Sequence, residues 1–265
     1  SGKATGSAYS ESLTAVFEAL QVSYDELEDW NCCGATMYMG IDAHKSFAMA
    51  TRNLALAERQ GKNGDTPPTL VPPCAACYTV LNKTKDYLAT YQDRKADILT
   101  ALKAVGLSYH AKVQVRHPLD VLVNDIGLDN ISRKVKRPLE GWRVASYYGC
   151  LLLRPYATFD DPYAPTSMDN LMAALGATPV EWSSKTRCCG ASLSGTIESV
   201  ALRLSQNILA EALEKGAQMV VTACPFCQFN LECFQNQMPP FNGSDRKIPV
   251  AFFTQLLGLA LGLSK

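Results

Sequence analysis

The chain has 265 residues, of which 47% are hydrophobic and 19% charged, and its formal net charge is zero. This composition is typical of a folded globular protein and excludes a disordered chain. It also argues against nucleic acid as a partner, because phosphate binding needs a broad basic face. The one basic run, 133–137, is interpreted as solvated linker.

The cysteine content indicates where the protein works. No apolar run reaches the roughly 20 residues that a membrane helix needs, and no secretory signal is recognised. The chain holds ten cysteines. In that number and without a secretory signal, cysteines favour metal or redox chemistry in a reducing compartment over a disulfide scaffold. We therefore expect a cytoplasmic protein without a membrane span.

In the first half, predicted helices alternate with predicted strands. Apolar spacing at i, i+3, i+4 and i+7 predicts a helix over 10–20. Asp42 is placed to cap a second helix, 42–60, which Gly61 ends. Further expected elements are a strand at 69–71, helices at 75–91 and 93–107, and a strand from Val113 that turns into a helix at Pro118.

The second half repeats this order. Its expected elements are a strand at 142–148, helices at 170–175 and 197–215, a strand at 219–223, a helix opened by Pro225, and a final strand and helix over 248–262. Strands that alternate with helices need crossover connections, so the strands should be parallel. We predict an α/β fold of two pseudo-symmetric halves, 1–128 and 142–265, each a small parallel sheet with helices. Residues 129–141 would link them.

Nine of the ten cysteines fall into two similar sets. The second half reads C-x37-C-C-x34-C-x2-C, and the first half contains the Cys-Cys and C-x2-C parts of the same pattern. The sets are Cys150, Cys188, Cys189, Cys224 and Cys227, and Cys32, Cys33, Cys74 and Cys77. Cys233 has no counterpart in the first half and is interpreted as structural. Each C-x2-C pair follows a predicted strand and opens a helix, where α/β proteins place ligands.

These sets favour an iron–sulfur cluster over other cysteine chemistry. A C-x2-C pair alone is shared by zinc sites, dithiol redox sites and iron–sulfur clusters. Adjacent thiolates cannot easily chelate one tetrahedral ion, but they can reach two irons of an extended cluster, and five cysteines exceed the usual four of a cubane. A structural zinc scaffold would be colourless. Inert buried cysteines are the remaining alternative, which the repeated spacing disfavours.

The two Cys-Cys-Gly motifs with their C-x2-C pairs, the stretch Tyr147–Pro155 and the tail 253–262 resemble the B-type subunit of heterodisulfide reductase, a CCG-domain protein. The resemblance covers essentially the whole chain. It implies that each half is a CCG-type domain in which five cysteines hold a noncubane 4Fe-4S cluster. The nine cysteines would then be the metal-binding and catalytic residues. The first ligand of the N-terminal set is not seen, and the family's spacing would place it immediately before Ser1.

The resemblance also implies a reaction and partners. In this family a disulfide, the coenzyme M–coenzyme B heterodisulfide of methanogenesis, is cleaved reductively between the two clusters. Because the cleavage takes two electrons and iron–sulfur clusters pass electrons singly, we expect each cluster to supply one. The chain lacks a ferredoxin-type cysteine run and a nucleotide fingerprint. We therefore expect a ferredoxin-like iron–sulfur subunit (C-type) and a flavoprotein subunit (A-type) to deliver the electrons. An anionic substrate would suit the nearby side chains of Lys45, Arg154, Lys185, Arg187 and His44.

Two alternative functions from the same superfamily remain open at this point. An electron-transfer subunit of a membrane-associated succinate- or glycolate-type oxidoreductase would pass electrons towards quinone and cleave nothing. A sulfur-oxidising heterodisulfide reductase-like subunit would run with a lipoate-bound disulfide. The nearly complete pair of cysteine sets favours disulfide reduction, while the particular disulfide and the direction of the reaction are open.

Overall fold

A computed structural model describes residues 4–35, 37–61, 66–241 and 247–264. The chain forms two compact units. One unit comprises residues 24–117, and the other combines residues 1–23 with residues 118–265. Below they are called the N-terminal unit and the C-terminal unit. The helices and parallel strands of both units confirm the predicted α/β class.

The N-terminal unit places helices beside a short parallel strand pair. Strand β1 (Thr69–Leu70) pairs with β2 (Gln114–Val115), with Leu70 opposite Val115. Its helices are α2 (Met37–Ile41), α3 (Ala43–Gln60), α4 (Ala75–Thr90) and α5 (Gln92–Ala104). Helix α3 begins as predicted, because the Asp42 carboxylate accepts a hydrogen bond from the Lys45 N–H at 3.0 Å. Its core side chains, among them Leu54 and Leu56, are fully buried.

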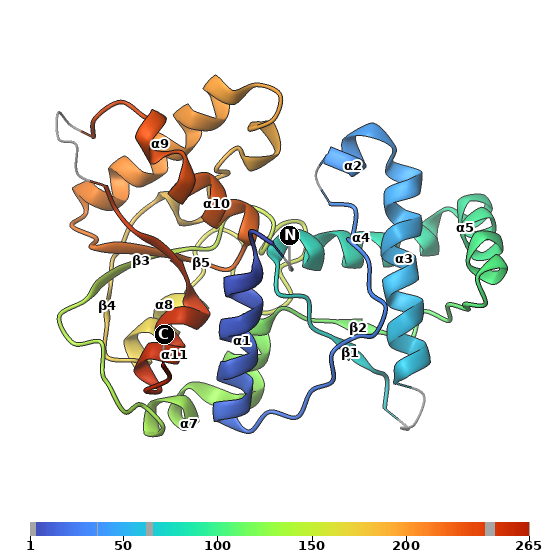
Figure 1. The fold of residues 1–265 in the computed structure, drawn as a ribbon, viewed down its shortest axis with the longest axis horizontal. Coiled ribbons are helices and arrows are strands. Elements are labelled where there is room, and N and C mark those ends of the chain that lie inside the picture. Colours follow the sequence, from blue (N-terminus) through green and yellow to red (C-terminus); the bar gives the residue numbers. More distant parts are fainter. Residues whose placement is uncertain (1–3, 36, 62–65, 242–246, 265) are drawn as a thin grey trace. The chain divides into compact units, whose positions relative to one another are not determined.

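The C-terminal unit is built on a four-stranded parallel sheet in the order β4-β3-β5-β6 (Figure 1). The strands are β3 (Arg143–Tyr147), β4 (Thr178–Pro179), β5 (Met219–Thr222) and β6 (Val250–Phe252). The α-helices are α1 (Ser7–Leu20), α6 (Pro118–Asp120), α7 (Leu128–Arg133), α8 (Ser167–Ala174), α9 (Glu198–Glu214), α10 (Pro225–Cys233) and α11 (Phe253–Ala260). A π-helix, η1 (Val121–Gly127), and the 3-10 helices η2 (Ser184–Thr186), η3 (Ala191–Leu193) and η4 (Gln235–Gln237) complete it. Strand β5 is buried throughout, as expected for a central parallel strand.

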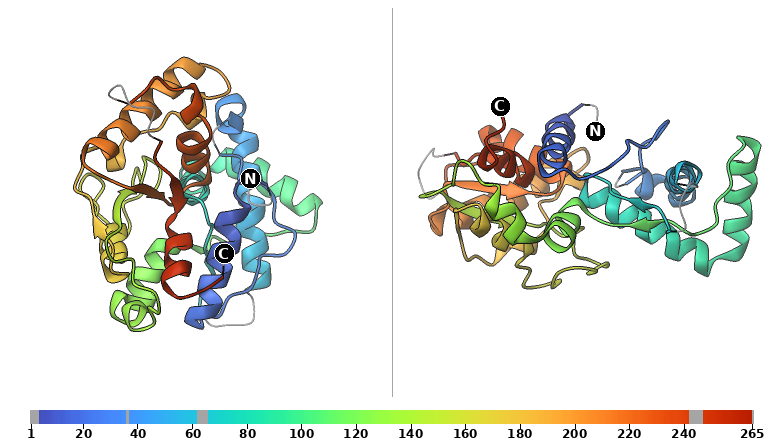
Figure 2. Two further views of the ribbon diagram at one scale, coloured as in Figure 1. Left: turned by 60° about the vertical axis from the view of Figure 1, so that its left-hand side comes forward. Right: turned by 90° about the horizontal axis from the view of Figure 1, so that it is seen from below.

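Helix α1 packs on the C-terminal unit although it opens the chain. It lies beside α11, as Figures 1 and 2 show. The Tyr9 ring stacks on Phe252 with centroids 4.7 Å apart, and the hydroxyls of Ser12 and Thr254 are 2.6 Å apart. The packing units therefore divide the chain differently from the sequence repeat. The predicted limits 1–128 and 142–265 describe that repeat and stay a prediction, and the predicted linker contains part of α7.

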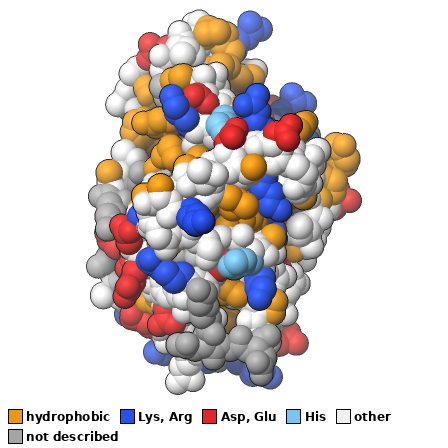
Figure 3. Space-filling view, turned by 90° about the vertical axis from the view of Figure 1, so that its right-hand side faces the viewer, with side chains coloured by type: hydrophobic (Ala, Val, Ile, Leu, Met, Phe, Trp, Pro, Cys, Tyr) orange, Lys and Arg blue, Asp and Glu red, His pale blue; other side chains and the backbone are white. Residues whose placement is uncertain are grey.

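The surface view in Figure 3 shows basic, acidic and apolar side chains interspersed on one face. Such a mixture is what a chain with 25 basic and 25 acidic residues should present. Among the residues that the structure describes, no helix combines the length and the apolar character needed to cross a membrane.

Candidate functional site

In the C-terminal unit, two neighbouring strands deliver cysteines to the same edge of the sheet. Strand β3 ends at Tyr147 and β5 at Thr222, and these residues are paired in the parallel register. Cys150 follows the first strand, and Cys224 follows the second as the N-cap of α10. Pro225 occupies the first turn of that helix, as predicted. The Cys150 and C-x2-C segments therefore meet at the carboxyl ends of parallel strands.

The Cys-Cys pair reaches this site through a left-handed turn. Gly190 has φ +78°, a conformation that side chains with a Cβ adopt at a cost. Cys189 is buried with its Sγ 3.6 Å from the Sγ of Cys227. Cys188 is exposed, and its Sγ accepts a hydrogen bond from the Gly190 N–H at 3.4 Å. The two adjacent thiols therefore differ in environment, one facing the interior and one the solvent.

Hydrogen bonds among these thiols give them different pKa values. The bond with Cys150, and then that from the Gly190 N–H, lower the pKa of Cys188 to about 6 against an opposing effect of burial. The same Cys150–Cys188 bond, together with burial, raises the pKa of Cys150. Bonds to Cys189 and Cys224, with burial, raise that of Cys227. One thiol of a bonded pair thus carries the negative charge more readily than its partner.

The N-terminal unit repeats this arrangement. Cys74 is the N-cap of α4, as Cys224 is of α10. The Sγ of Cys33 lies 2.8 Å from that of Cys77, and Gly34 has φ +75°. Cys33 is buried and Cys32 is exposed, which is the same division as in the second pair. Hydrogen bonds with Cys32 and then Cys77 lower the pKa of Cys33 to about 4, and the first of these raises the pKa of Cys32.

Polar side chains from the helix that follows each Cys-Cys pair hold the pair in place. In the N-terminal unit, Ser46 of α3 donates to the Gly34 carbonyl at 2.8 Å. Asn53 of the same helix accepts from the N–H of Asn31 and donates to its carbonyl. The sequence pattern did not identify these two side chains, because a polar residue within a helix carries no spacing signal. Asn53 and Ser46 are nonetheless buried.

Helix α9 has the same role in the C-terminal unit. The carboxylate of Glu211 accepts hydrogen bonds from the Ser183 N–H and from both the Ser183 and Ser184 hydroxyls. Ser205 donates to the Cys189 carbonyl at 2.9 Å. Although burial alone would raise it, the Ser184 and Ser183 hydrogen bonds lower the pKa of Glu211. The segment that leads to Cys188 is therefore fixed by groups that spacing alone did not reveal.

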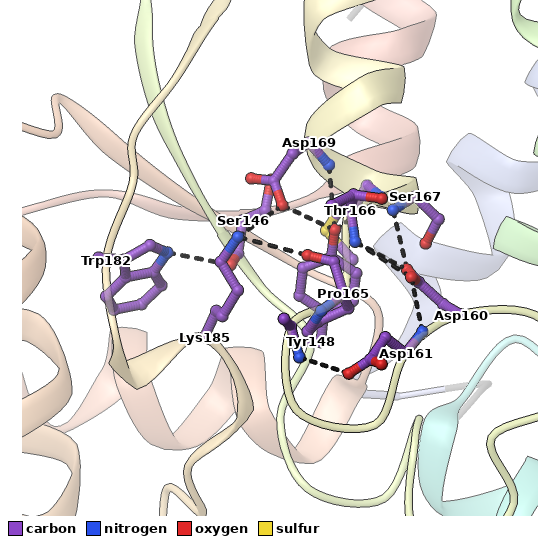
Figure 4. A network of polar contacts seen from close by, with 12 residues as sticks. Ser146, Tyr148, Asp160, Asp161, Pro165, Thr166, Ser167, Asp169, Trp182 and Lys185 are labelled. Carbon is purple, nitrogen blue, oxygen red and sulfur yellow. Dashed lines mark hydrogen bonds and ion pairs between the residues drawn. The ribbon is translucent and has the colours of Figure 1, made fainter.

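Of the predicted anion-binding side chains, Lys185 is engaged in a buried network, shown in Figure 4. Its Nζ lies 2.9 Å from Oδ2 of Asp169, and both side chains are less than a tenth exposed. The Tyr148 hydroxyl donates to the same carboxylate at 2.8 Å. Burial raises the pKa of Asp169, and Lys185 and Tyr148 oppose that shift. The Lys185 carbonyl accepts from the N–H groups of Tyr148 and Gly149, which joins the Cys150 segment to the Cys188 segment.

The other side chains predicted to bind an anionic substrate differ in how exposed they are to solvent. Lys45 is largely exposed and pairs with Asp42, 3.2 Å away, at the start of α3. His44 is half-buried in the same turn, and its Nδ1 is buried without a hydrogen-bond partner. Arg187 is exposed, and its carbonyl accepts from the Tyr147 hydroxyl. Arg154 donates to the Thr186 carbonyl. Its charge also acts on Cys188, whose pKa it helps to lower.

The donor set suits a multi-iron centre better than a single ion. Within the described residues, no three His, Cys, Asp or Glu side chains are grouped so as to hold one metal ion. A tetrahedral zinc site needs four such donors at about 2.0–2.3 Å from one point. However, soft thiols gather from two segments in the N-terminal unit and from three in the C-terminal unit, and adjacent cysteines divide between interior and surface. Such a spread fits a cluster in which different thiolates bind different irons. Cys233 lies at the end of α10 and is exposed.

Comparisons with known proteins identify the class. The model of the CCG cysteine-rich domain family matches residues 2–82 and 144–232. The chain is therefore a two-repeat member of the CCG cysteine-rich domain family, as its motifs predicted.

Relatives within that family narrow the assignment. The chain is 34% identical over 257 residues to the 8-methylmenaquinol:fumarate reductase membrane anchor subunit of Wolinella succinogenes, covering 96% of this chain and 86% of the relative. It is 32% identical over 254 residues to the B-type subunit of the ferredoxin/F420H2-dependent CoB-CoM heterodisulfide reductase of Methanosarcina acetivorans, covering 93% and 82%. These names confirm the resemblance to the B-type heterodisulfide reductase subunits and make the chain a relative of subunits of multi-subunit oxidoreductases.

A solved structure supports the fold. The crystal structure of a hypothetical protein from Helicobacter pylori superposes with a TM-score of 0.73 at 14% sequence identity. The match covers 97% of this chain and 46% of that chain, so the present chain spans about half the length of this structural neighbour. At that identity the likeness concerns the fold alone.

Proposed function

We propose that the chain is an iron–sulfur redox subunit that holds two noncubane 4Fe-4S clusters. The proposed ligands are Cys32, Cys33, Cys74 and Cys77 for one cluster, and Cys150, Cys188, Cys189, Cys224 and Cys227 for the other. The observation that carries the proposal is the pairing of thiols in both units, at 2.8 Å for Cys33–Cys77 and 3.6 Å for Cys189–Cys227. Both pairs join a Cys-Cys turn to the first turn of a helix.

The surroundings of the thiols are consistent with an anionic cofactor. Cys74 and Cys224 cap the N-termini of α4 and α10, where backbone N–H groups and the helix dipole favour negative charge. The pKa values of Cys33 and Cys188, at about 4 and about 6, favour thiolates, which are the ligand form. Each unit therefore supplies one thiol with a lowered pKa, Cys33 or Cys188, and a cysteine at a helix N-terminus that can stabilise the negative charge of a cluster.

The reaction that we propose is reductive cleavage of a disulfide. Two electrons and two protons convert the disulfide to two thiols, and the S–S bond is the one that breaks. Iron–sulfur clusters exchange electrons singly, so two of them can supply the pair. The electrons would come from a ferredoxin-like subunit and a flavoprotein subunit, since neither kind of cofactor motif is found in the chain. A cytoplasmic location is part of this proposal. Among the basic candidates, Arg154 and Arg187 lie on segments beside Cys150 and Cys188.

A second function has a specific observation in its favour. The 34% identity to a menaquinol:fumarate reductase subunit is as high as that to the heterodisulfide reductase relatives. In that case the chain would pass electrons between a quinone-linked partner and a flavoprotein without cleaving a substrate. Both functions require iron–sulfur clusters, and they differ in whether the reduced protein makes thiols.

The first experiment measures iron and acid-labile sulfide in anaerobically purified chain. We expect about eight irons per chain for two 4Fe-4S clusters, and Cys227→Ser should lose about half of them. Cys233→Ser is the matched control, because Cys233 lies on the same helix but outside both sets, and it should keep its iron. Zinc in place of iron, or equal losses in both variants, would overturn the cluster proposal.

The second experiment separates the two functions. The iron-loaded chain is reduced with titanium(III) citrate and mixed with the coenzyme M–coenzyme B heterodisulfide, and free thiols are counted. Two thiols per disulfide consumed would support disulfide reduction. Reoxidation by a menaquinone analogue without thiol release would favour the electron-transfer function instead.

A further inference from the structure

The side chain of Asn230 lies beside the C-terminal thiol site and makes hydrogen bonds with both its nitrogen and its oxygen. It is only 2% exposed and lies three residues after Cys227 on α10. Its Nδ2 donates to the Cys189 carbonyl at 2.7 Å and to the Ser205 hydroxyl at 2.8 Å. Its Oδ1 accepts from the Ser194 hydroxyl. Because both N–H groups and the oxygen are engaged, the orientation of this amide is fixed.

These contacts join three elements around one peptide. The Ser205 hydroxyl also donates to the Cys189 carbonyl, so this carbonyl accepts one bond from α9 and one from α10. Helix α10 carries Cys227, whose Sγ is 3.6 Å from that of Cys189. A shift of Cys189 away from α10 would break the hydrogen bond between its buried carbonyl and the buried Asn230 amide, which costs free energy because each group loses a partner.

The N-terminal unit cannot make the same contact. The residue three places after Cys77 is Val80, which is buried and has no donor. The hydroxyl that supports this turn, from Ser46, instead bonds the carbonyl of Gly34, one residue further along the motif. The two repeats therefore hold equivalent cysteine turns with different hydrogen bonds.

We propose that Asn230 is a positioning residue that fixes Cys189 beside Cys227 and makes the C-terminal thiol site more rigid than the N-terminal one. A more rigid set of ligands should release iron more slowly, and this consequence of the positioning rests on the proposed function. The positioning itself concerns the geometry of the chain and can be tested without a cluster.

The test compares thiol alkylation in the metal-free, anaerobic full-length chain. Asn230→Val introduces the residue of the equivalent N-terminal position, and Asn230→Asp keeps the shape but removes the donors. Iodoacetamide labelling is followed at each cysteine by mass spectrometry. Alkylation of Cys189 should be about tenfold faster in both variants, because opening no longer breaks these buried hydrogen bonds, while Cys33 and the buried Cys224 should keep their rates.

Controls distinguish local from global effects. Asn82→Val removes an amide that bonds the Tyr78 carbonyl of its own helix α4, and it should leave Cys33 and Cys189 unchanged. Ser205→Ala removes one of the two donors to Cys189 and gives a milder variant should Asn230→Val fail to fold; it should raise Cys189 labelling by a smaller factor. Wild-type labelling of Cys189 in the Asp variant, or equal rises at Cys189 and Cys224, would overturn the proposal.

A second measurement concerns the loaded protein. Iron release to a chelator should be biphasic in the wild type, and Asn230→Val should speed the slower phase only. An unchanged slow phase would contradict the role of Asn230 in holding the cluster. Absence of bound iron would instead contradict the proposed function, and the alkylation result would still decide what Asn230 does.

Discussion

Replacing Gly190 with alanine should test how tightly the second Cys-Cys-Gly turn is packed. The residue has φ +78°, so any Cβ there costs about 1–2 kcal/mol for the left-handed conformation. The new Cβ would also lie 2.9 Å from the Cα of Ala201 and 3.0 Å from Cδ1 of Leu204. The first neighbour is helix backbone and cannot swing aside. Overpacking of this kind costs about 1–3 kcal/mol, and we expect Gly190→Ala to lose about 2–5 kcal/mol in total.

A matched control exists in the same compact unit. Gly141 has the same φ of +78°, and a Cβ added there meets no heavy atom within 4 Å. Gly141→Ala should therefore lose only the conformational part, about 1–2 kcal/mol. Urea unfolding of the metal-free chain, followed by tryptophan fluorescence to which the buried Trp182 contributes, gives both values. If the two variants lost the same free energy, the contact with Ala201 would not constrain the turn and the packing argument would be refuted.

Other predictions concern the groups around the thiols. Lys185→Met or Asp169→Leu should each cost about 3–5 kcal/mol because a buried charge is left uncompensated, and the double variant should cost less than their sum; a double-mutant cycle by urea unfolding measures this, and strict additivity would contradict it. Glu211→Gln should flatten the loss of stability in acid. Hydrogen bonds from Ser184 and Ser183 hold the pKa of Glu211 below 4.5, so its contribution to the free energy of unfolding is present above pH 4.5 and is lost as the pH falls through the lower folded value. The urea midpoint is measured at several pH values for the wild type and for Glu211→Gln. The prediction would be refuted if the midpoint fell with decreasing pH at the same rate in both proteins. Removing iron by chelation should lower Tm, because bound metal stabilises the folded chain; a Tm independent of iron would argue against a folded metal site.

Local signals in the sequence predicted the elements well. Asp42 as an N-cap, Gly61 after α3 and Pro225 in the first turn of α10 all act over a few residues, so the sequence shows both partners. The same holds for the parallel strands, whose crossover helices follow from the order of elements. The π-helix over 121–127 was not predicted, because an apolar pattern does not separate it from an α-helix.

Contacts between residues far apart in the sequence could not be predicted from such local signals. The apolar stripe of α1 indicated that one face is buried but not that it packs on α11, about 240 residues later in the chain. The paired arrangement of cysteines could be foreseen from their repeated spacing. The side chains that hold them, such as Asn53, Ser205 and Asn230, could not, since a polar residue inside a helix is usually taken to face solvent.

In each Cys-Cys pair one cysteine is buried and the other exposed, and this difference suggests which side chains distinguish the reactions of the family. Relatives named for heterodisulfide reduction and for menaquinol:fumarate reduction match this chain to similar extents, so overall similarity does not by itself decide the reaction. In both pairs the second cysteine is buried, and the first, Cys32 or Cys188, is the member that a substrate or partner can reach. Differences between the reactions should therefore lie in the side chains around these exposed thiols. The basic side chains on the segments around Cys188 are Arg154 and Arg187, and under the proposed disulfide reaction their positive charge would suit an anionic substrate.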